Sequence, residues 1–400
     1  MKFILHLIPA YPATAEERER LRPIAHCTDK TQQLLDEMLE LTQLCEDVGF
    51  DIVTFSEHHF YTEGCEAGAT PTPHLIRLLM NTKRIKIGPL GFVLPTWDPI
   101  RLALDVAWAD QISKGRAICG LARGVFPRWV NVLGQHYGVT PGFIGPEADE
   151  HNREVFEELF EVVKLAWKDE PFSFKGKYYQ VPFPAEGHFW APHEATARYG
   201  APGEMEGQML RKLSAVPKPY QKPHPPVFQA FTASEKTVRW AAREGVIPIV
   251  FQPFDLTTKS FLNYQNEANK FGRGLKLGDS IGTGQFIYIA NSQAEAHRMW
   301  RDGSFFVFRN FHSKVDPNIP PTPEPLLEHR MTVRGTPDDV RRRLAEIQET
   351  QNPEYLLWLS DQGYLSLDDM RRQIELFATK VMPEFRDRAA PAAAEASPLQ

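Results

Sequence analysis

A carboxylate and two imidazoles stand together in the segment Glu57–Phe60, directly after the predicted strand 52–56. Histidine titrates near neutral pH and therefore suits general-base work, which makes His58 and His59 candidate catalytic groups. A structural interpretation stays open, in which the imidazoles only hydrogen-bond within a polar rim. A metal site is disfavoured, because no further cluster of His, Asp or Glu has ligand spacing.

Three other segments carry residues suited to holding a ligand. Leu90 and Gly91 follow the third predicted strand, and a glycine there lets a planar ligand or a backbone approach closely. Arg123 follows the fourth strand and can bind a phosphate through two donors, although a surface ion pair would also explain it. Hydroxyl groups surround the start of the helix predicted after the fifth strand, where free N–H groups favour an anion, and simple helix capping is the alternative. These hydroxyls belong to Thr232, Ser234 and Thr237.

Short β-type runs alternate with longer amphipathic runs along the chain, which is typical of βαβ units and a parallel sheet. The alternation predicts a (β/α)8 TIM barrel, in which the ends of the strands meet at one rim and form the active site. We expect one domain over residues 1–388, with insertions at about 170–219 and 310–328 and a disordered tail at 389–400. The eight expected strands are 2–7, 52–56, 85–88, 116–121, 227–230, 247–250, 280–290 and 355–359.

Composition narrows the classes of partner. The formal net charge is −6 and no long Lys/Arg run occurs, which argues against nucleic acid as a partner. No segment reaches the apolar length of a membrane span. The four cysteines are widely spaced and include no C-x-x-C pair, which is typical of a reducing, cytoplasmic setting.

Taken together, these segments resemble the bacterial luciferase-like family of flavin-dependent monooxygenases. The likeness covers roughly residues 1–165 and 215–290, and the C-terminal third shares only the strand–helix rhythm. The matching motifs are 48–51 (VGFD), 57–60 (EHHF), 91–96 (GFVLPT), 98–101 (DPIR), 110–116 (DQISKGR), 122–124 (ARG), 223–227 (PHPPV) and 240–245 (WAAREG).

The resemblance implies a two-component monooxygenase that uses reduced FMN and O2 to oxygenate a hydrophobic organic substrate through a C4a-(hydro)peroxyflavin. His58 would be the base at that intermediate. Leu90 and Gly91 would lie against the isoalloxazine, where relatives carry a non-prolyl cis peptide. The FMN phosphate would be held by Arg123, Thr232, Ser234 and Thr237. A separate flavin reductase would supply the cofactor, because no nicotinamide-binding fingerprint follows a strand, and the family implies a dimer.

Two departures from the family pattern keep alternatives open. The luciferase catalytic subunit has a reactive cysteine before the phosphate-binding arginine, whereas this chain has Ala122, and Cys119 lies too early to replace it. The silent luciferase subunit shares the Glu-His-His-Phe tetrapeptide but lacks the arginine. A non-catalytic flavin-binding subunit and an F420-dependent hydride-transfer oxidoreductase are therefore the competing hypotheses. The aromatic-rich segment 170–219 is expected to act as a lid that excludes water.

Overall fold

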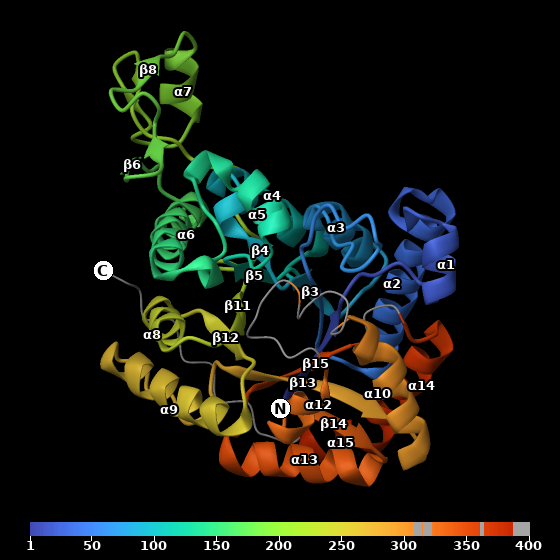
Figure 1. The fold of residues 1–400 in the computed structure, drawn as a ribbon. Coiled ribbons are helices and arrows are strands. Elements are labelled where there is room, and N and C mark those ends of the chain that lie inside the picture. The colour runs from blue at the N-terminus through green and yellow to red at the C-terminus, as the bar shows by residue number, and fades with distance from the viewer. Residues whose placement is uncertain (308–313, 315–321, 361–363, 387–400) are drawn as a thin grey trace.

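The computed structural model describes residues 1–307, 314, 322–360 and 364–386. Within these residues, eight parallel strands form a sheet whose ends meet (Figure 1). A parallel bridge between Ile87 and Ala117 joins the third strand to the start of the fourth and closes the circle. The predicted (β/α)8 barrel is confirmed. Its strands are β1 (Lys2–Leu7), β2 (Ile52–Phe55), β3 (Lys86–Pro89), β5 (Cys119–Ala122), β11 (Val227–Thr232), β12 (Ile247–Val250), β13 (Gly282–Ile289) and β15 (Tyr355–Leu359).

Two short strands lie beside the circle of eight and were not predicted. β4 (Phe92–Val93) pairs with the end of β5, and β14 (Thr332–Gly335) pairs with the second half of β13. β13 is long enough to pair with β15 through Gly282–Phe286 and with β14 through Phe286–Ile289. Strands this short leave too little alternation to be recognised in the sequence.

Helices cover the outside of the barrel, and the apolar core lies between them and the strands. Local signals fix several ends: Asp98 caps α4, Ser234 caps α8, and Gly49 ends α2 in the left-handed conformation at φ 93°. The main helices are α2 (Thr28–Val48), α3 (Pro71–Met80), α4 (Pro99–Ser113), α6 (Pro146–Trp167), α8 (Glu235–Glu244), α9 (Phe254–Lys270), α10 (Gln293–Val307), α13 (Pro337–Thr350) and α14 (Leu367–Lys380). Shorter ones are α1 (Ala15–Arg20), α5 (Pro127–Leu133), α7 (His193–Tyr199), α12 (Glu324–Glu328) and α15 (Met382–Phe385). Over the described ranges, no helix has the length and apolar character needed to cross a bilayer.

The first predicted insertion, residues 170–219, has more regular structure than its composition indicated. It forms the hairpin β6–β7 (Phe174–Lys175 and Gln180–Val181), then β8 (His188–Phe189), α7, β9 (Met205–Glu206) and β10 (Met209–Leu210). The hairpin is fastened to α6, because the Glu158 carboxylate accepts from the backbone N–H groups of Tyr178 and Tyr179. Beyond the hairpin, the part with β8 and α7 projects away from the barrel (Figure 1). The second predicted insertion, 310–328, falls mostly outside the described residues, as does the tail 389–400.

Candidate active site at the strand ends

Each predicted site residue lies at or just beyond the carboxyl end of a barrel strand. His58 follows β2, Leu90 and Gly91 follow β3, and Arg123 follows β5. Thr232 ends β11, and Ser234 and Thr237 stand at the start of α8. Because parallel strands end at the same rim, segments far apart in sequence come together there.

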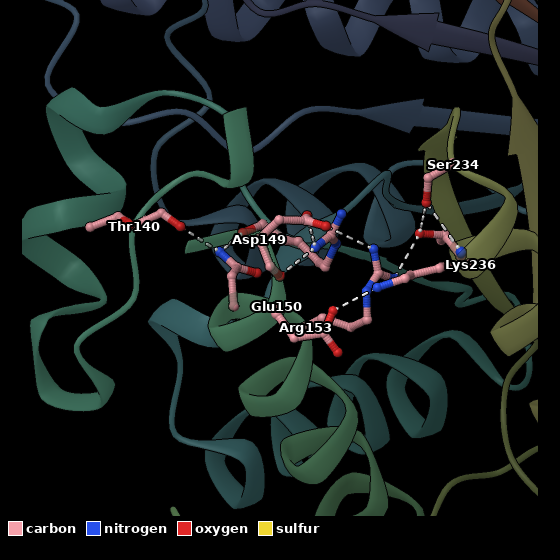
Figure 2. A network of polar contacts seen from close by, with 9 residues as sticks. Thr140, Asp149, Glu150, Arg153, Ser234 and Lys236 are labelled. Carbon is pink, nitrogen blue, oxygen red and sulfur yellow. Dashed lines mark hydrogen bonds and ion pairs between the residues drawn. The ribbon is translucent and has the colours of Figure 1, made fainter. Parts of the chain in front are cut away.

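A network of polar side chains lies where α6 meets the start of α8 (Figure 2). Arg153 Nη1 donates to Thr237 Oγ1 at 3.2 Å, and the Ser234 and Thr237 hydroxyls are 2.8 Å apart. Asp149 joins the two cations, with Arg123 Nη1 at 2.6 Å and Arg153 Nη2 at 3.3 Å from its carboxylate oxygens. Arg123, Ser234 and Thr237 therefore belong to one polar network.

Arg153 is the member of this network that sequence reasoning missed. It lies on α6, thirty residues after Arg123, and its side chain is 9% exposed. A buried guanidinium that contacts a helix N-terminus is a strong phosphate donor. The sequence signal was its position four residues after Asp149, which puts both side chains on one helix face.

The electrostatics of the network favour an anion. Burial alone would raise the pKa of Asp149, but the hydrogen bond and charge of Arg123, together with Arg153, hold that pKa below its usual range. Burial, followed by the charge of Arg153, lowers the pKa of Arg123, whose guanidinium nevertheless stays charged at neutral pH. Two cations thus face one carboxylate beside the positive end of α8.

The donor set fits an organic phosphate. The site offers two guanidinium groups, two hydroxyls and the free N–H groups of a helix N-terminus, which is the chemistry that a dianion requires. Arg153 Nε is buried and has no hydrogen-bond partner within the described part of the chain. Thr232 has a buried hydroxyl without a partner among those same residues, but no contact links it to the arginines.

The two histidines each have their own carboxylate. Glu57, buried at 2% exposure, lies 2.9 Å from Nε2 of His59 and also accepts from Val93 N at 2.7 Å and Trp97 Nε1 at 3.0 Å. Nδ1 of His58 lies instead 3.1 Å from Oε2 of Glu66. Glu57 therefore holds His59 and the loop after β4, and it does not serve His58.

Aromatic rings surround His58. Its imidazole packs edge-on against Phe126, Trp129 and Tyr61, with centroid distances of 5.3, 6.1 and 6.2 Å. Trp129 is 1% exposed, and its Nε1 has no hydrogen-bond partner among the described residues. Apart from the Glu66 carboxylate, His58 is thus packed among aromatic rings, and the indole N–H of Trp129 is available to a polar atom.

The Leu90–Gly91 peptide is cis, as the family resemblance implied. A Cβ on Gly91 would lie 2.5 Å from Gly120 C and from Leu121 N, both backbone atoms of the neighbouring strand. Leu90 itself is 1% exposed. Glycine is therefore required at position 91 by the close approach of two chain segments, which was one of the two reasons considered from the sequence.

The aromatic side chains of the projecting insertion do not cover the rim. Phe183 is 83% exposed and Tyr199 is 75% exposed, and Phe189 and Trp190 are also exposed. The structure therefore shows the projecting part of the insertion turned away from the barrel, and its role as a lid stays a prediction. The physical reason is that the hairpin is anchored along the outside of α6, which directs the rest of the insertion outward.

Cys119 lies on β5, three residues before the end of the strand. Cys119 is completely buried, and burial raises the pKa of its thiol. Within the described residues, no three His, Cys, Asp or Glu side chains gather as a metal site.

The fold and the site define a parallel-barrel protein with an arginine-containing polar network and a histidine pair at the strand ends. A family model described as luciferase-like monooxygenase matches residues 21–351, and the chain belongs to this family.

Individual relatives are distant. The chain is 24% identical over 377 residues to the oxygenase component of a flavin-dependent trigonelline monooxygenase from Acinetobacter baylyi, covering 89% of this chain and 91% of that protein.

Solved structures share the fold. The oxygenating constituent of 3,6-diketocamphane monooxygenase from Pseudomonas putida, in complex with FMN, aligns with a TM-score of 0.70 at 20% identity, covering 96% of this chain and 98% of that one. A coenzyme F420-dependent tetrahydromethanopterin reductase from Methanopyrus kandleri aligns with a TM-score of 0.61 at 15% identity, covering 96% of this chain and 99% of that one. At this identity both likenesses concern the fold alone.

Proposed function

We propose that this chain is the oxygenase component of a two-component monooxygenase, which takes reduced FMN from a separate flavin reductase and oxygenates a hydrophobic organic substrate with O2. The observation that supports the proposal is that one rim carries both a polar network with two arginines at the start of α8 and a histidine packed among aromatic rings. The first suits the tail of a mononucleotide, and the second suits proton transfer beside a reacting ring.

The bound flavin and the residues of the chain would have different roles in this reaction. Bound reduced flavin would supply the two electrons that activate O2; one oxygen atom enters the substrate and the other leaves as water. Arg123, Arg153 and the hydroxyls of Ser234 and Thr237 would hold the phosphate. His58 would take or give the proton, and Phe126 and Trp129 would keep water from it.

The test combines the purified chain with a generic flavin reductase, NADH, O2 and a panel of apolar substrates, followed by mass spectrometry. A product heavier by one oxygen atom supports the proposal, and a parallel reaction under 18O2 must move the label into that product. NADH oxidation that yields only hydrogen peroxide would favour the non-catalytic flavin-binding subunit. Tighter binding of reduced F420 than of reduced FMN would favour the hydride-transfer enzyme and contradict the proposal.

His58→Ala tests the proposed base within this reaction. We expect coupled oxygenation to fall by about 10²- to 10⁴-fold, because a positioned base contributes that much to a rate. FMN affinity should change little, since the phosphate network does not include His58. Product formation at the wild-type rate would remove His58 from the mechanism.

A further inference from the structure

The loop that follows β2 is closed on itself and fastened to the N-terminal segment. His58 N donates to Gly68 O at 3.2 Å, so that the two ends of the loop meet. Tyr11 N donates to Gly64 O at 2.8 Å, and the Arg18 guanidinium donates to Glu63 O at 2.9 Å. The backbone of this loop is thereby held in one conformation.

Glu66 occupies an unusual place in this loop. Its φ is 52°, in the left-handed region that side chains other than glycine rarely adopt, and its side chain is 7% exposed. A buried carboxylate is costly unless a partner compensates it. Oε2 of Glu66 lies 3.1 Å from Nδ1 of His58, whose side chain is 18% exposed, and the geometry of this contact is that of an ion pair and not of a hydrogen bond.

We propose that Glu66 is the positioning residue for His58: its carboxylate, at ion-pair distance from Nδ1, favours the proton on that nitrogen and leaves Nε2 as the nitrogen that exchanges a proton with the reacting group. The two nitrogens of a neutral imidazole differ, and a hydrogen bond to one decides which of them carries the proton. This inference rests on the proposed function, because it gives His58 the role of base.

Three other titratable groups lie near His58 within the part of the chain that the structure describes. His6 from β1 is neutral at neutral pH, because burial, and then the charge of His58, lower its pKa to about 3. Burial, followed by the charge of Glu66, raises the pKa of Tyr61, which therefore keeps its proton. On α5, Arg128 pairs with Glu63 at 2.8 Å.

Glu57 is the carboxylate adjacent in sequence, but it is already engaged. It accepts from Val93 N and Trp97 Nε1, and it lies 2.9 Å from His59 Nε2. Of these two carboxylates, Glu66 is the one at contact distance from His58.

The experiment compares the wild-type chain with Glu66→Gln and, as a matched control, Glu63→Gln. Glu63 belongs to the same loop, but its side chain is 43% exposed and pairs with a surface arginine. Histidine 15N resonances are recorded against pH without flavin, and His58 is assigned by its loss in His58→Ala. In the wild type, we expect the neutral form of His58 to carry its proton on Nδ1.

In Glu66→Gln, the pKa of the His58 imidazole should move down, because a neutral amide no longer favours the charged ring. Glu63→Gln should titrate like the wild type. A wild-type His58 protonated on Nε2, or the same titration in all three proteins, would overturn the proposal. If Glu66→Gln does not fold, the tautomer of His58 in the wild type by itself decides whether the proposal holds.

A second measurement follows oxygenation against pH. A positioning role predicts a lower kcat in Glu66→Gln with an acid limb displaced to lower pH, whereas a merely structural role lowers the rate without moving the limb. Failure of the wild type to oxygenate any substrate would count against the proposed function, while the 15N titration would still decide the role of Glu66. If the wild type oxygenates a substrate but the titration of His58 does not depend on Glu66, the positioning role of Glu66 is rejected and the proposed function stands.

Discussion

Arg123, at a strand end, and Arg153, on α6, both pair with the Asp149 carboxylate. Arg153 also donates to the hydroxyl of Thr237. Charge-assisted hydrogen bonds of this kind are about twice as strong as neutral ones. A ligand that carries a phosphate should therefore bind this chain more tightly than the same ligand without the phosphate.

Arg123→Ala should weaken FMN binding by about ten- to a hundred-fold, because a hydrogen bond to a charged group contributes about 1.5–3 kcal/mol. Riboflavin, which lacks the phosphate, should bind the variant and the wild type equally. Quenching of flavin fluorescence measures both affinities. Arg239→Ala, which removes an exposed arginine of α8 paired with Glu235, is the control. Unchanged FMN affinity in Arg123→Ala would show that the phosphate lies elsewhere.

His6 makes stability depend on pH. It is 1% exposed and its Nδ1 lies 2.9 Å from Thr54 Oγ1, and its folded-state pKa is lowered from 6.5 to about 3, chiefly by burial. The unfolded chain therefore binds a proton at this residue first as the pH falls. Its contribution to stability is fully present above about pH 6.5 and is lost progressively toward pH 3.

Urea unfolding at pH 7.5 and pH 5 tests this expectation. Between these values the wild type should lose about 2 kcal/mol more free energy of unfolding than His6→Gln, at roughly 1.4 kcal/mol per pKa unit. His136→Gln, at an exposed position, should follow the wild type. An equal loss in His6→Gln and the wild type would mean that His6 does not couple folding to protons.

At the scale of elements, β3 and β5 approach each other so closely that glycine is needed at Gly88, Gly91 and Gly120. A Cβ at Gly120 would lie 2.2 Å from Pro89 O and 2.9 Å from Leu90 Cα. Neither atom belongs to a flexible side chain, so the strands themselves would have to separate. This contact places the segments of Leu90 and Arg123 side by side at the rim.

Gly120→Ala should lower the free energy of unfolding by about 1–3 kcal/mol or more, the usual cost of overpacking a well-packed interior. Gly145→Ala is the control, because nothing lies within 4 Å of a Cβ there and the backbone is extended. Chemical denaturation followed by circular dichroism compares them. A fully stable Gly120→Ala would show that the strands can separate at little cost.

At the scale of the whole molecule, α3 and α4 pack together and leave large apolar side chains exposed. Trp108 is 55% exposed, Ile112 one turn later on α4 is 45% exposed, and Met80 at the end of α3 is 69% exposed. Large exposed apolar side chains of this kind are candidates for a protein interface. A second copy of the chain is the partner we expect, as the family resemblance implied.

Trp108→Glu should convert the expected dimer into a monomer, because a charged group would be buried in an apolar interface. Light scattering coupled to gel filtration gives the mass directly. Tyr199→Glu, on the projecting insertion, changes an exposed aromatic residue in the same way and should leave the mass unaltered. A wild-type chain that is already monomeric would contradict the expectation.

The order of strands and helices could be derived from the sequence, because hydrophobic periodicity and capping residues act locally. The eight strands and the exact bounds of α4 and α13 followed from such signals. Since parallel strands end at one rim, the sequence also determined that Glu57–Phe60, Leu90–Gly91, Arg123 and the start of α8 would share it.

Only the tertiary structure decided which charged groups pair. It placed Glu66 rather than Glu57 on His58, brought Arg153 to Thr237, and directed the insertion after α6 away from the rim. These choices depend on loop conformation and on contacts between residues as far apart as Arg153 and Thr237. Composition and periodicity do not encode these contacts, because composition carries no positions and periodicity describes only residues close together in the sequence.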